Sequence, residues 1–349
     1  VAPARVVIVG AGAIGAFYGG VLARAGCEVS AVVRSDYDAI ARDGYRIESV
    51  AQGDLSFRPA QVMRSGSDYR GEPDYVLCAL KQVAGVDRAA LIRPALAPAT
   101  TIVLVQNGID VEDDIARAFP QHELISAVAY SAVSREAPGH VVHHSGYTRL
   151  VLGNYPQGVS PAVERFAALI KGGGTSMQVT KDIVGARWQK CAWNTVFNPI
   201  SALGGGLGTR DILASEATTQ FVKETIAEVC AIARASGHPL ADDTVEKQIQ
   251  GTLRMPNYVS SMGQDLLAGR PMEPEALLGN AVRIARRLSV PAPRLEALYA
   301  LLLMLEQKGS RYGGAPSPVP SGLCMTTVST QRPNLKPTER SVPPRRNPR

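Results

Sequence analysis

The apolar positions in the first half of the chain form short continuous runs. The first run covers residues 5–9 (RVVIV), and others follow at 28–33, 75–80 and 101–106. Continuous β-branched and apolar residues are typical of strands that are buried on both faces of a parallel sheet. Because helical patterns separate these runs, the sequence predicts an α/β domain with a mostly parallel sheet.

Three later apolar runs are separated by residues that favour turns. They cover residues 124–130, 141–144 and 148–152, with Pro138-Gly139 and Ser145-Gly146 between them. Short runs joined by such turns are typical of antiparallel strands. We therefore expect them to form an antiparallel end of the same sheet.

From about residue 182 onward, the apolar positions recur with a helical period. The predicted helices cover residues 182–200, 211–236, 241–250, 257–268, 274–288 and 293–307. The sequence thus predicts an α/β domain over residues 1–175 and an all-helical domain over residues 176–308. A basic, proline-rich tail over residues 309–349 is expected to be disordered.

The 349-residue chain has a formal net charge of +6, and the predicted tail accounts for all of it. The tail holds seven basic residues and one acid, so the remainder of the chain is neutral overall. A neutral folded part gives no reason to expect a nucleic-acid partner. No apolar stretch approaches the roughly 20 residues that a membrane helix needs, and we identify no signal peptide.

The five cysteines are scattered along the chain without a CxxC pair. This usage is typical of a protein in the reducing cytoplasm, where we expect this chain to act. His143 and His144 are adjacent but have no acidic or cysteine partner at ligand spacing, so we expect no metal site.

A glycine-rich turn follows the first predicted strand and opens a predicted helix. It consists of Gly10, Ala11, Gly12, Ala13, Ile14 and Gly15. In this setting the first glycine allows a tight turn, the second lets the backbone approach a pyrophosphate, and the third lets the helix pack on the strand. The N-terminus of the helix also favours phosphate charge. The turn therefore predicts a Rossmann-like dinucleotide-binding domain.

The end of the second predicted strand indicates which dinucleotide binds. Enzymes that use NAD place an acid there for the ribose 2′-hydroxyl, whereas an arginine suits the 2′-phosphate of NADP. Arg34 stands at this point beside Ser35, and its guanidinium can form a forked pair with phosphate. Asp36 is the main objection, because a carboxylate there suits NAD. We expect NADP(H) as the cofactor.

A lysine and two asparagines follow at intervals of four residues in the first helix of the second domain. At about 100° per residue, Lys190, Asn194 and Asn198 lie on one side of this helix. A lysine ammonium can stabilise the charge that hydride transfer builds on a carbonyl oxygen and can then supply the proton. The same spacing also suits a polar stripe on an ordinary amphipathic helix. Pro199 is expected to end or kink the helix.

A second polar group surrounds a predicted helix start further along the chain. Ser261 and Asp265 lie on one helix face, and Pro274 suits the first position of the next helix. Glu273 would then face the space between the domains, where it can pair with Lys190 or hold the substrate or cofactor. The electrostatics of a helix start explain this carboxylate equally well.

Taken in order, these segments resemble the ketopantoate reductase (2-dehydropantoate 2-reductase) family over residues 5–307. The motifs that carry the resemblance are Gly10–Gly15, Arg34, Leu80-Lys81, Gln106-Asn107-Gly108, Lys190-x3-Asn194-x3-Asn198, Ser261-Met262-x2-Asp265 with Gly269-Arg270-x2-Glu273, and Val290-Pro291-x-Pro293 with Leu298-Tyr299. Several motifs in a fixed order are more specific than any one of them.

The resemblance implies an NADP-dependent oxidoreductase that reduces ketopantoate, a small 2-keto acid, to pantoate in the synthesis of pantothenate and coenzyme A. It implies Lys190 as the general acid and Glu273 as its acidic companion. Cofactor contacts are implied for Lys81 and Asn107, in addition to the glycine turn and Arg34. Substrate contacts are implied for Lys190, Asn194, Asn198, Ser261 and Asn107. A homodimer is compatible with the apolar faces of the helical domain.

Two segments depart from the family pattern. Residues 272–275 read Met-Glu-Pro-Glu where the family usually has Thr-Glu-Ile-Asp, and residues 204–210 lack an asparagine that the family often carries. These differences leave open a related NADPH-dependent reductase of another small 2-keto acid. A non-enzymatic NADP-binding regulator is a third alternative, which the retained lysine, asparagines and glutamate disfavour.

Overall fold

The computed structural model describes residues 2–311. The tail predicted over residues 309–349 falls outside this range except for its first residues, which belong to the last helix. None of the described helices is long and apolar enough to cross a membrane.

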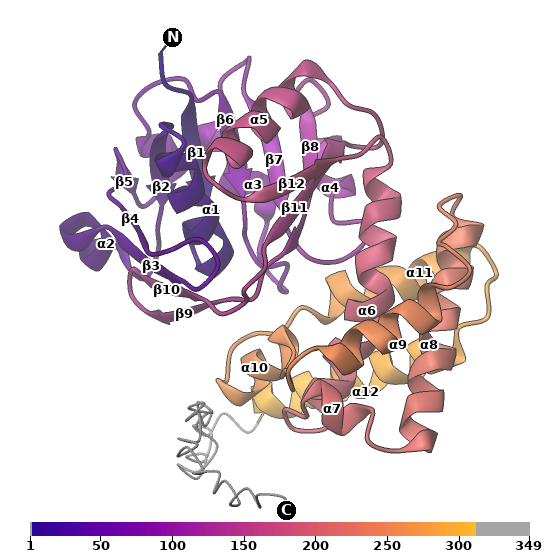
Figure 1. The fold of residues 1–349 in the computed structure, drawn as a ribbon. Helices are drawn as coiled ribbons and strands as arrows, with labels where there is room; N and C mark the ends of the chain where they lie inside the picture. The colour runs from indigo at the N-terminus through magenta and orange to yellow at the C-terminus, as the bar shows by residue number, and fades with distance from the viewer. Residues whose placement is uncertain (1, 312–349) are drawn as a thin grey trace, which may run out of the picture. The chain divides into compact units, whose positions relative to one another are not determined.

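An eight-stranded sheet forms the centre of the N-terminal domain (Figure 1). Its strands are β1 (Arg5–Val9), β2 (Glu28–Val32), β5 (Val62–Met63), β6 (Tyr75–Cys78), β7 (Thr101–Val105), β8 (Leu124–Tyr130), β11 (Arg149–Asn154) and β12 (Ser176–Val179). They run in the order β12-β11-β8-β7-β6-β1-β2-β5, and every neighbouring pair is parallel except β8 and β11. The predicted mostly parallel sheet is confirmed.

The continuous apolar runs are explained by two cores, one on each face of this sheet. In β1, Val6 and Ile8 point into a core shared with α1 (Ala13–Arg24) and α5 (Pro161–Gly172). Val7 and Val9 point to the other face, where α3 (Arg88–Ile92) and α4 (Asp113–Ala118) pack. Both sides of the strand are therefore buried, as the pattern predicted.

The expected antiparallel end of the sheet is confirmed for two of its three runs and wrong for the third. β8 and β11 pair antiparallel in the large sheet, whereas the run at 141–144 belongs to a separate four-stranded sheet. That sheet has the order β4-β3-β10-β9, formed by β4 (Leu55–Phe57), β3 (Tyr45–Ser49), β10 (His140–His143) and β9 (Val133–Ala137). The small sheet packs on α1, and β10 buries alternate residues against this helix. The run at 141–144 therefore belongs to the small sheet and not to the large one.

The C-terminal part is helical, as predicted. Its elements are α6 (Ile183–Leu203), α7 (Thr209–Ile212), α8 (Glu216–Ala235), α9 (Thr244–Arg254), α10 (Ser261–Leu267), a π-helical turn η3 (Glu275–Gly279), α11 (Asn280–Arg287) and α12 (Pro293–Arg311). Short helices elsewhere are α2 (Tyr37–Asp43), η1 (Gly66–Asp68) and η2 (Arg93–Ala95). α6 contacts both β8 and β11 of the large sheet and α8, α10 and α12 of the helical part, so it connects the two cores (Figure 1).

Pro199 does not end α6, which continues to Leu203. Proline in a helix removes one backbone hydrogen bond and normally disfavours its continuation. Here Pro199, Ser201 and Ala202 are buried against neighbouring helices, and this packing stabilises the extra turn. The helix ends instead at Gly204.

Candidate active site

The glycine turn between β1 and α1 is tight at its ends and open in its middle. Gly10 has a φ of +92°, and a Cβ there would lie 2.7 Å from the backbone nitrogen of Leu80. A Cβ on Gly15 would lie 2.4 Å from the carbonyl oxygen of Gly10. At Gly12, by contrast, no described atom outside its immediate neighbours comes within 4 Å of the Cβ position. The turn therefore fits a pyrophosphate that approaches the N-terminus of α1, where Ala13 and Ile14 form the first turn.

The two basic residues predicted to contact the cofactor follow strands on either side of β1. Arg34 follows β2, and its side chain is exposed. Lys81 follows β6, directly after the residue that touches Gly10. Its ammonium donates to the Oδ2 atom of Asp265 in α10 at 2.5 Å and to the carbonyl oxygen of Pro271 at 3.3 Å. The structure thus brings Lys81 to the glycine turn and also ties it to the helical part.

Lys190 lies where α6 passes the carboxyl ends of β7 and β8. Its Nζ atom donates to the Oδ1 atom of Asn107 and to the carbonyl oxygen of Ala129, both at 2.6 Å. Burial and, to a smaller extent, the positive charge of Arg187 lower the pKa of Lys190 to about 8. The ammonium is therefore oriented by two acceptors and releases its proton more readily than an exposed lysine.

The predicted asparagines line the same region of α6. Lys190, Asn107 and Asn194 all line one small pocket, and Asn194 is 8% exposed. Asn198 is deeper, with 1% exposure, and its Nδ2 atom has no hydrogen-bond partner among the described residues. A buried amide nitrogen without a partner is costly, so Asn198 is a donor that a bound molecule can satisfy.

Ser261 is the first residue of α10, and this helix begins beside Asn198. The preceding residue, Ser260, caps α10 and donates weakly to the carbonyl oxygen of Asn198 at 3.5 Å. The side chain of Ser261 is exposed. It remains a predicted substrate contact, placed next to the deep end of the asparagine row.

The sequence left open whether Glu273 pairs with Lys190 or holds the substrate or cofactor, and its described hydrogen bonds do not include Lys190. Its Oε1 atom accepts a hydrogen bond from the backbone nitrogen of Gln82 at 2.8 Å, and the described contacts join it to the nucleotide-binding side rather than to Lys190. Burial raises the pKa of Glu273, while the Gln82 N–H and the charge of Lys81 oppose that rise. Its charge still acts on Lys190, whose pKa it raises slightly against the effect of burial.

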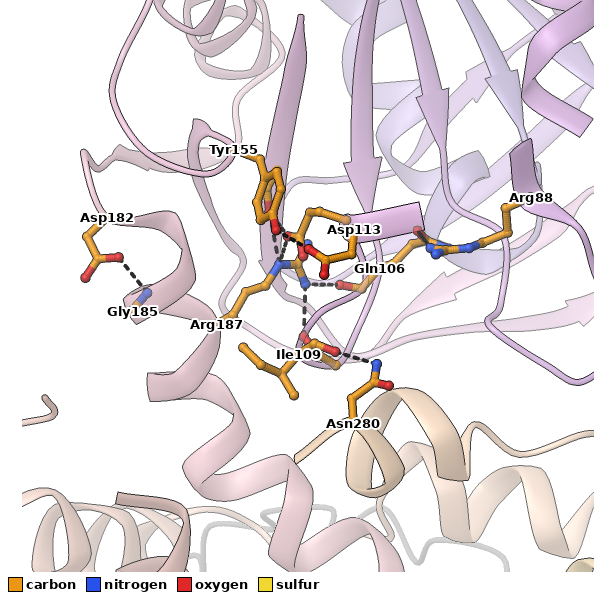
Figure 2. A network of polar contacts seen from close by, with 12 residues as sticks. Arg88, Gln106, Ile109, Asp113, Tyr155, Asp182, Gly185, Arg187 and Asn280 are labelled. Carbon is orange, nitrogen blue, oxygen red and sulfur yellow. Dashed lines mark hydrogen bonds and ion pairs between the residues drawn. The ribbon is translucent and has the colours of Figure 1, made fainter. Parts of the chain in front are cut away.

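A buried arginine, which the sequence analysis missed, organises the loop that carries Asn107. The Arg187 side chain is 1% exposed and pairs with the equally buried Glu112, and its Nε atom also donates to the Oγ atom of Ser126 at 3.0 Å. Its Nη1 atom donates to the carbonyl oxygens of Gln106 at 2.8 Å and Gly108 at 3.2 Å. Figure 2 shows Arg187 reaching from α6 toward this loop. The residues on both sides of Asn107 are therefore fixed by one guanidinium.

The loop that carries Asn107 is also held by residues of η3 and α11. Asn280, at the start of α11, donates to the carbonyl oxygen of Ile109 at 2.7 Å (Figure 2). The backbone nitrogen of Ile109 donates to the carbonyl oxygen of Ala276 at 3.2 Å. Gly108 has a φ of +106°, and a Cβ there would lie 2.3 Å from that same oxygen. The Gln-Asn-Gly motif thus combines a conformational requirement for glycine with a fixed asparagine.

Comparison with known proteins shows to which family this chain belongs. The family model described as "Ketopantoate reductase PanE/ApbA" matches residues 6–157, and the model of its C-terminal domain matches residues 182–306. This chain belongs to the ketopantoate reductase family. It is an oxidoreductase with the Rossmann-like nucleotide-binding domain and helical C-terminal domain of that family.

Members of the ketopantoate reductase family resemble the chain over most of its length. A 2-dehydropantoate 2-reductase of Methylococcus capsulatus has a solved structure with 48% sequence identity, covering 88% of this chain and 98% of its own, with a TM-score of 0.83. The 2-dehydropantoate 2-reductase of Mesorhizobium japonicum is 31% identical over 86% of this chain and 97% of its own length. A D-mandelate dehydrogenase with NADH is 18% identical, with a TM-score of 0.78 over 88% of this chain and 99% of its own, and shares the fold.

The geometry of the glycine turn predicts that two substitutions can separate cofactor binding from the stability of the fold. A valine at Gly12 points into open space and should change the free energy of unfolding by no more than about 0.5 kcal/mol, yet block approach of the pyrophosphate. A valine at Gly15 overpacks the turn and should cost about 1–3 kcal/mol. Urea unfolding and NADPH titration of Gly12→Val and Gly15→Val measure both effects. Undiminished NADPH affinity in Gly12→Val would contradict the assigned approach.

The buried ion pair predicts a large asymmetry between single and double variants. Glu112→Ala leaves Arg187 charged and unpaired in the interior, which should lower the free energy of unfolding by about 3–5 kcal/mol. Glu112→Leu combined with Arg187→Met removes both charges and should recover much of that loss in urea unfolding.

An exposed ion pair supplies the control for this measurement. Arg234 pairs with Asp242 on the surface, and Arg234→Ala should cost less than about 1 kcal/mol. A Glu112→Ala variant as stable as Arg234→Ala would show that the buried pair does not hold the loop.

Proposed function

We propose that this chain reduces ketopantoate to pantoate with NADPH. The observation that carries the proposal is the ammonium of Lys190, which is oriented by Asn107 and Ala129 beside a row of two asparagines. Ketopantoate offers a carbonyl, a carboxylate and a terminal hydroxyl, which need a proton donor and several neutral or cationic hydrogen-bond donors. A non-enzymatic regulator would not need a lysine held in this way.

Lys190 acts as the general acid in this proposal. NADPH, when bound along the glycine turn, supplies the hydride that adds to the substrate carbonyl carbon. The negative charge that develops on the carbonyl oxygen is stabilised by the Lys190 ammonium, and the proton on Nζ then passes to that oxygen. Asn107 and Ala129 hold Nζ in place, so the lysine needs little reorganisation during the reaction.

The substrate is held by uncharged groups around this lysine. Asn194 and Asn198 face the carbonyl and hydroxyl oxygens in the proposal, and the unpartnered Nδ2 atom of Asn198 gains its missing hydrogen bond. Ser261 contacts the carboxylate from the start of α10. Glu273 is a carboxyl group with a raised pKa, and the backbone nitrogen of Gln82 holds it on the nucleotide-binding side of the site.

NADPH is favoured over NADH by the contacts of Asp36. The carboxylate that was the main objection to NADP accepts hydrogen bonds from Arg135 at 2.6 Å and from Ser35 at 2.9 Å. It is therefore already engaged and less able to accept from the 2′-hydroxyl of NADH. Arg34 stays exposed at the end of β2, where a 2′-phosphate would lie.

A related 2-keto acid is the second candidate substrate, because of the segment after α6. The carbonyl oxygen of Leu207 accepts from the Oγ atom of Ser201 at 2.7 Å, and Gly206 has a φ of +97°. Residues 204–208 contain four glycines and a leucine and offer no side-chain amide. A substrate without the terminal hydroxyl would lose less binding energy in such a site, because no side-chain amide of this segment is there to bond the hydroxyl.

Loss of NADPH absorbance on addition of ketopantoate tests the proposed reaction. We expect turnover, and we expect trimethylpyruvate, which lacks only the hydroxyl, to have a kcat/KM lower by about a hundredfold or more. Lys190→Ala should reduce kcat by about 10²–10⁴ while NADPH binding persists. No turnover of ketopantoate would refute the proposal, and a preference for trimethylpyruvate would support the second candidate.

The lowered pKa of Lys190 predicts the pH dependence of reduction. A general acid must be protonated, so the rate should fall as the pH rises above about 8. Asn107→Asp places a carboxylate against Nζ, which raises the pKa of Lys190 and should move this fall upward by roughly one unit or more. An alkaline limb at the same pH in the wild type and in Asn107→Asp would exclude Lys190 as its source.

A further inference from the structure

We propose that Arg135 is a second cation, beside Arg34, of the site that binds the 2′-phosphate of NADPH. Arg135 belongs to β9 in the small sheet, far from Arg34 in the sequence. This inference rests on the proposed function, since it requires NADPH as the cofactor. It assigns a cofactor-selecting role to a strand outside the Rossmann-like sheet.

The contact between Arg135 and Asp36 brings the small sheet to the end of β2. The Nη1 atom of Arg135 donates to the Oδ2 atom of Asp36 at 2.6 Å, and the hydroxyl of Ser35 donates to Oδ1 at 2.9 Å. The Asp36 side chain is 9% exposed, whereas that of Arg135 is 44% exposed. Because a guanidinium has five N–H donors, the pair with Asp36 leaves donors for a second anion at the surface.

Tyr45 shows that this pair lies close to the glycine turn. Its hydroxyl donates to the carbonyl oxygen of Ala11 at 3.1 Å. The pKa of Tyr45 is raised mainly by burial and also by the negative charge of Asp36, while the positive charge of Arg135 opposes the rise. The ion pair is therefore within electrostatic reach of a side chain that touches the turn. A ribose between the pyrophosphate and the end of β2 would lie beside this pair.

The other nearby cation has different partners. Arg64 follows β5, the neighbour of β2, and its guanidinium stacks over the ring of Tyr37 at 4.1 Å. It also pairs with the exposed Asp38 at 3.5 Å. Arg64 therefore contacts side chains at the start of α2, whereas Arg135 pairs with Asp36 itself, the carboxylate that bears on the choice of cofactor, and the geometry assigns Arg135 to the phosphate on this ground.

Arg135 affects both cofactors, in opposite directions. A bare carboxylate at Asp36 would repel a doubly charged 2′-phosphate and would accept a hydrogen bond from the 2′-hydroxyl of NADH. The ion pair cancels that repulsion and occupies the acceptor, and the remaining guanidinium donors can bind the phosphate directly. The preference for NADPH thus depends on Arg135 as well as on Arg34.

Calorimetric titration with 2′,5′-ADP and 5′-AMP tests this role without turnover. In Arg135→Gln we expect the affinity for 2′,5′-ADP to fall by about tenfold to a hundredfold, as for a lost charge-assisted hydrogen bond, with 5′-AMP binding retained. Arg234→Gln loses a surface pair with Asp242 and is the matched control, with both affinities unchanged. An Arg135→Gln variant that binds 2′,5′-ADP as the wild type does would overturn the inference.

A double variant separates direct contact from neutralisation of Asp36. If Arg135 binds the phosphate, Asp36→Asn combined with Arg135→Gln stays weaker than Asp36→Asn alone for 2′,5′-ADP. Equal affinities of these two variants would show that Arg135 only offsets the carboxylate, and would overturn the inference. If the wild type itself shows no preference for 2′,5′-ADP over 5′-AMP, the choice of NADPH in the proposed function fails instead, and this inference fails with it.

Discussion

The buried guanidinium of Arg187 is the constraint on which the arrangement of the site depends. A charge in the interior must be paired, and here Glu112, Ser126 and two carbonyl oxygens of one loop accept hydrogen bonds from the Nε and Nη1 atoms. The loop after β7 therefore has to turn toward α6. That turn places Asn107 against Lys190, which lies on the same helix as Arg187.

Burial at this junction also determines the acid–base properties of the site. It lowers the pKa of Lys190 and raises that of Glu273, so burial favours the neutral form of both groups. The two are held by different partners, Asn107 for the lysine and Gln82 for the glutamate. A second link between the domains, from Lys81 to Asp265, lies close to the glycine turn and joins α10 to the nucleotide-binding side.

The small sheet extends the nucleotide site beyond the parallel sheet. Its strands cover α1, and through Tyr45 and Arg135 they reach the glycine turn and the end of β2. Selection between cofactors in the proposed site is therefore shared by two sheets. The asparagine row of α6 lies in the second half of that helix, which the glycine-rich segment at residues 204–208 follows.

The sequence by itself determined the elements whose cause is local. Continuous apolar runs require burial on both faces, and the turn at Gly10 requires a positive φ, so the parallel sheet and its nucleotide turn could be predicted. The helical spacing of Lys190 and Asn194 likewise placed both on one face of α6. Only the tertiary structure decided which distant groups meet. The separate sheet of β10, the continuation of α6 past Pro199, the pair of Arg187 with Glu112 and the contact of Arg135 with Asp36 all depend on packing between segments far apart in the chain, which periodicity and spacing do not encode.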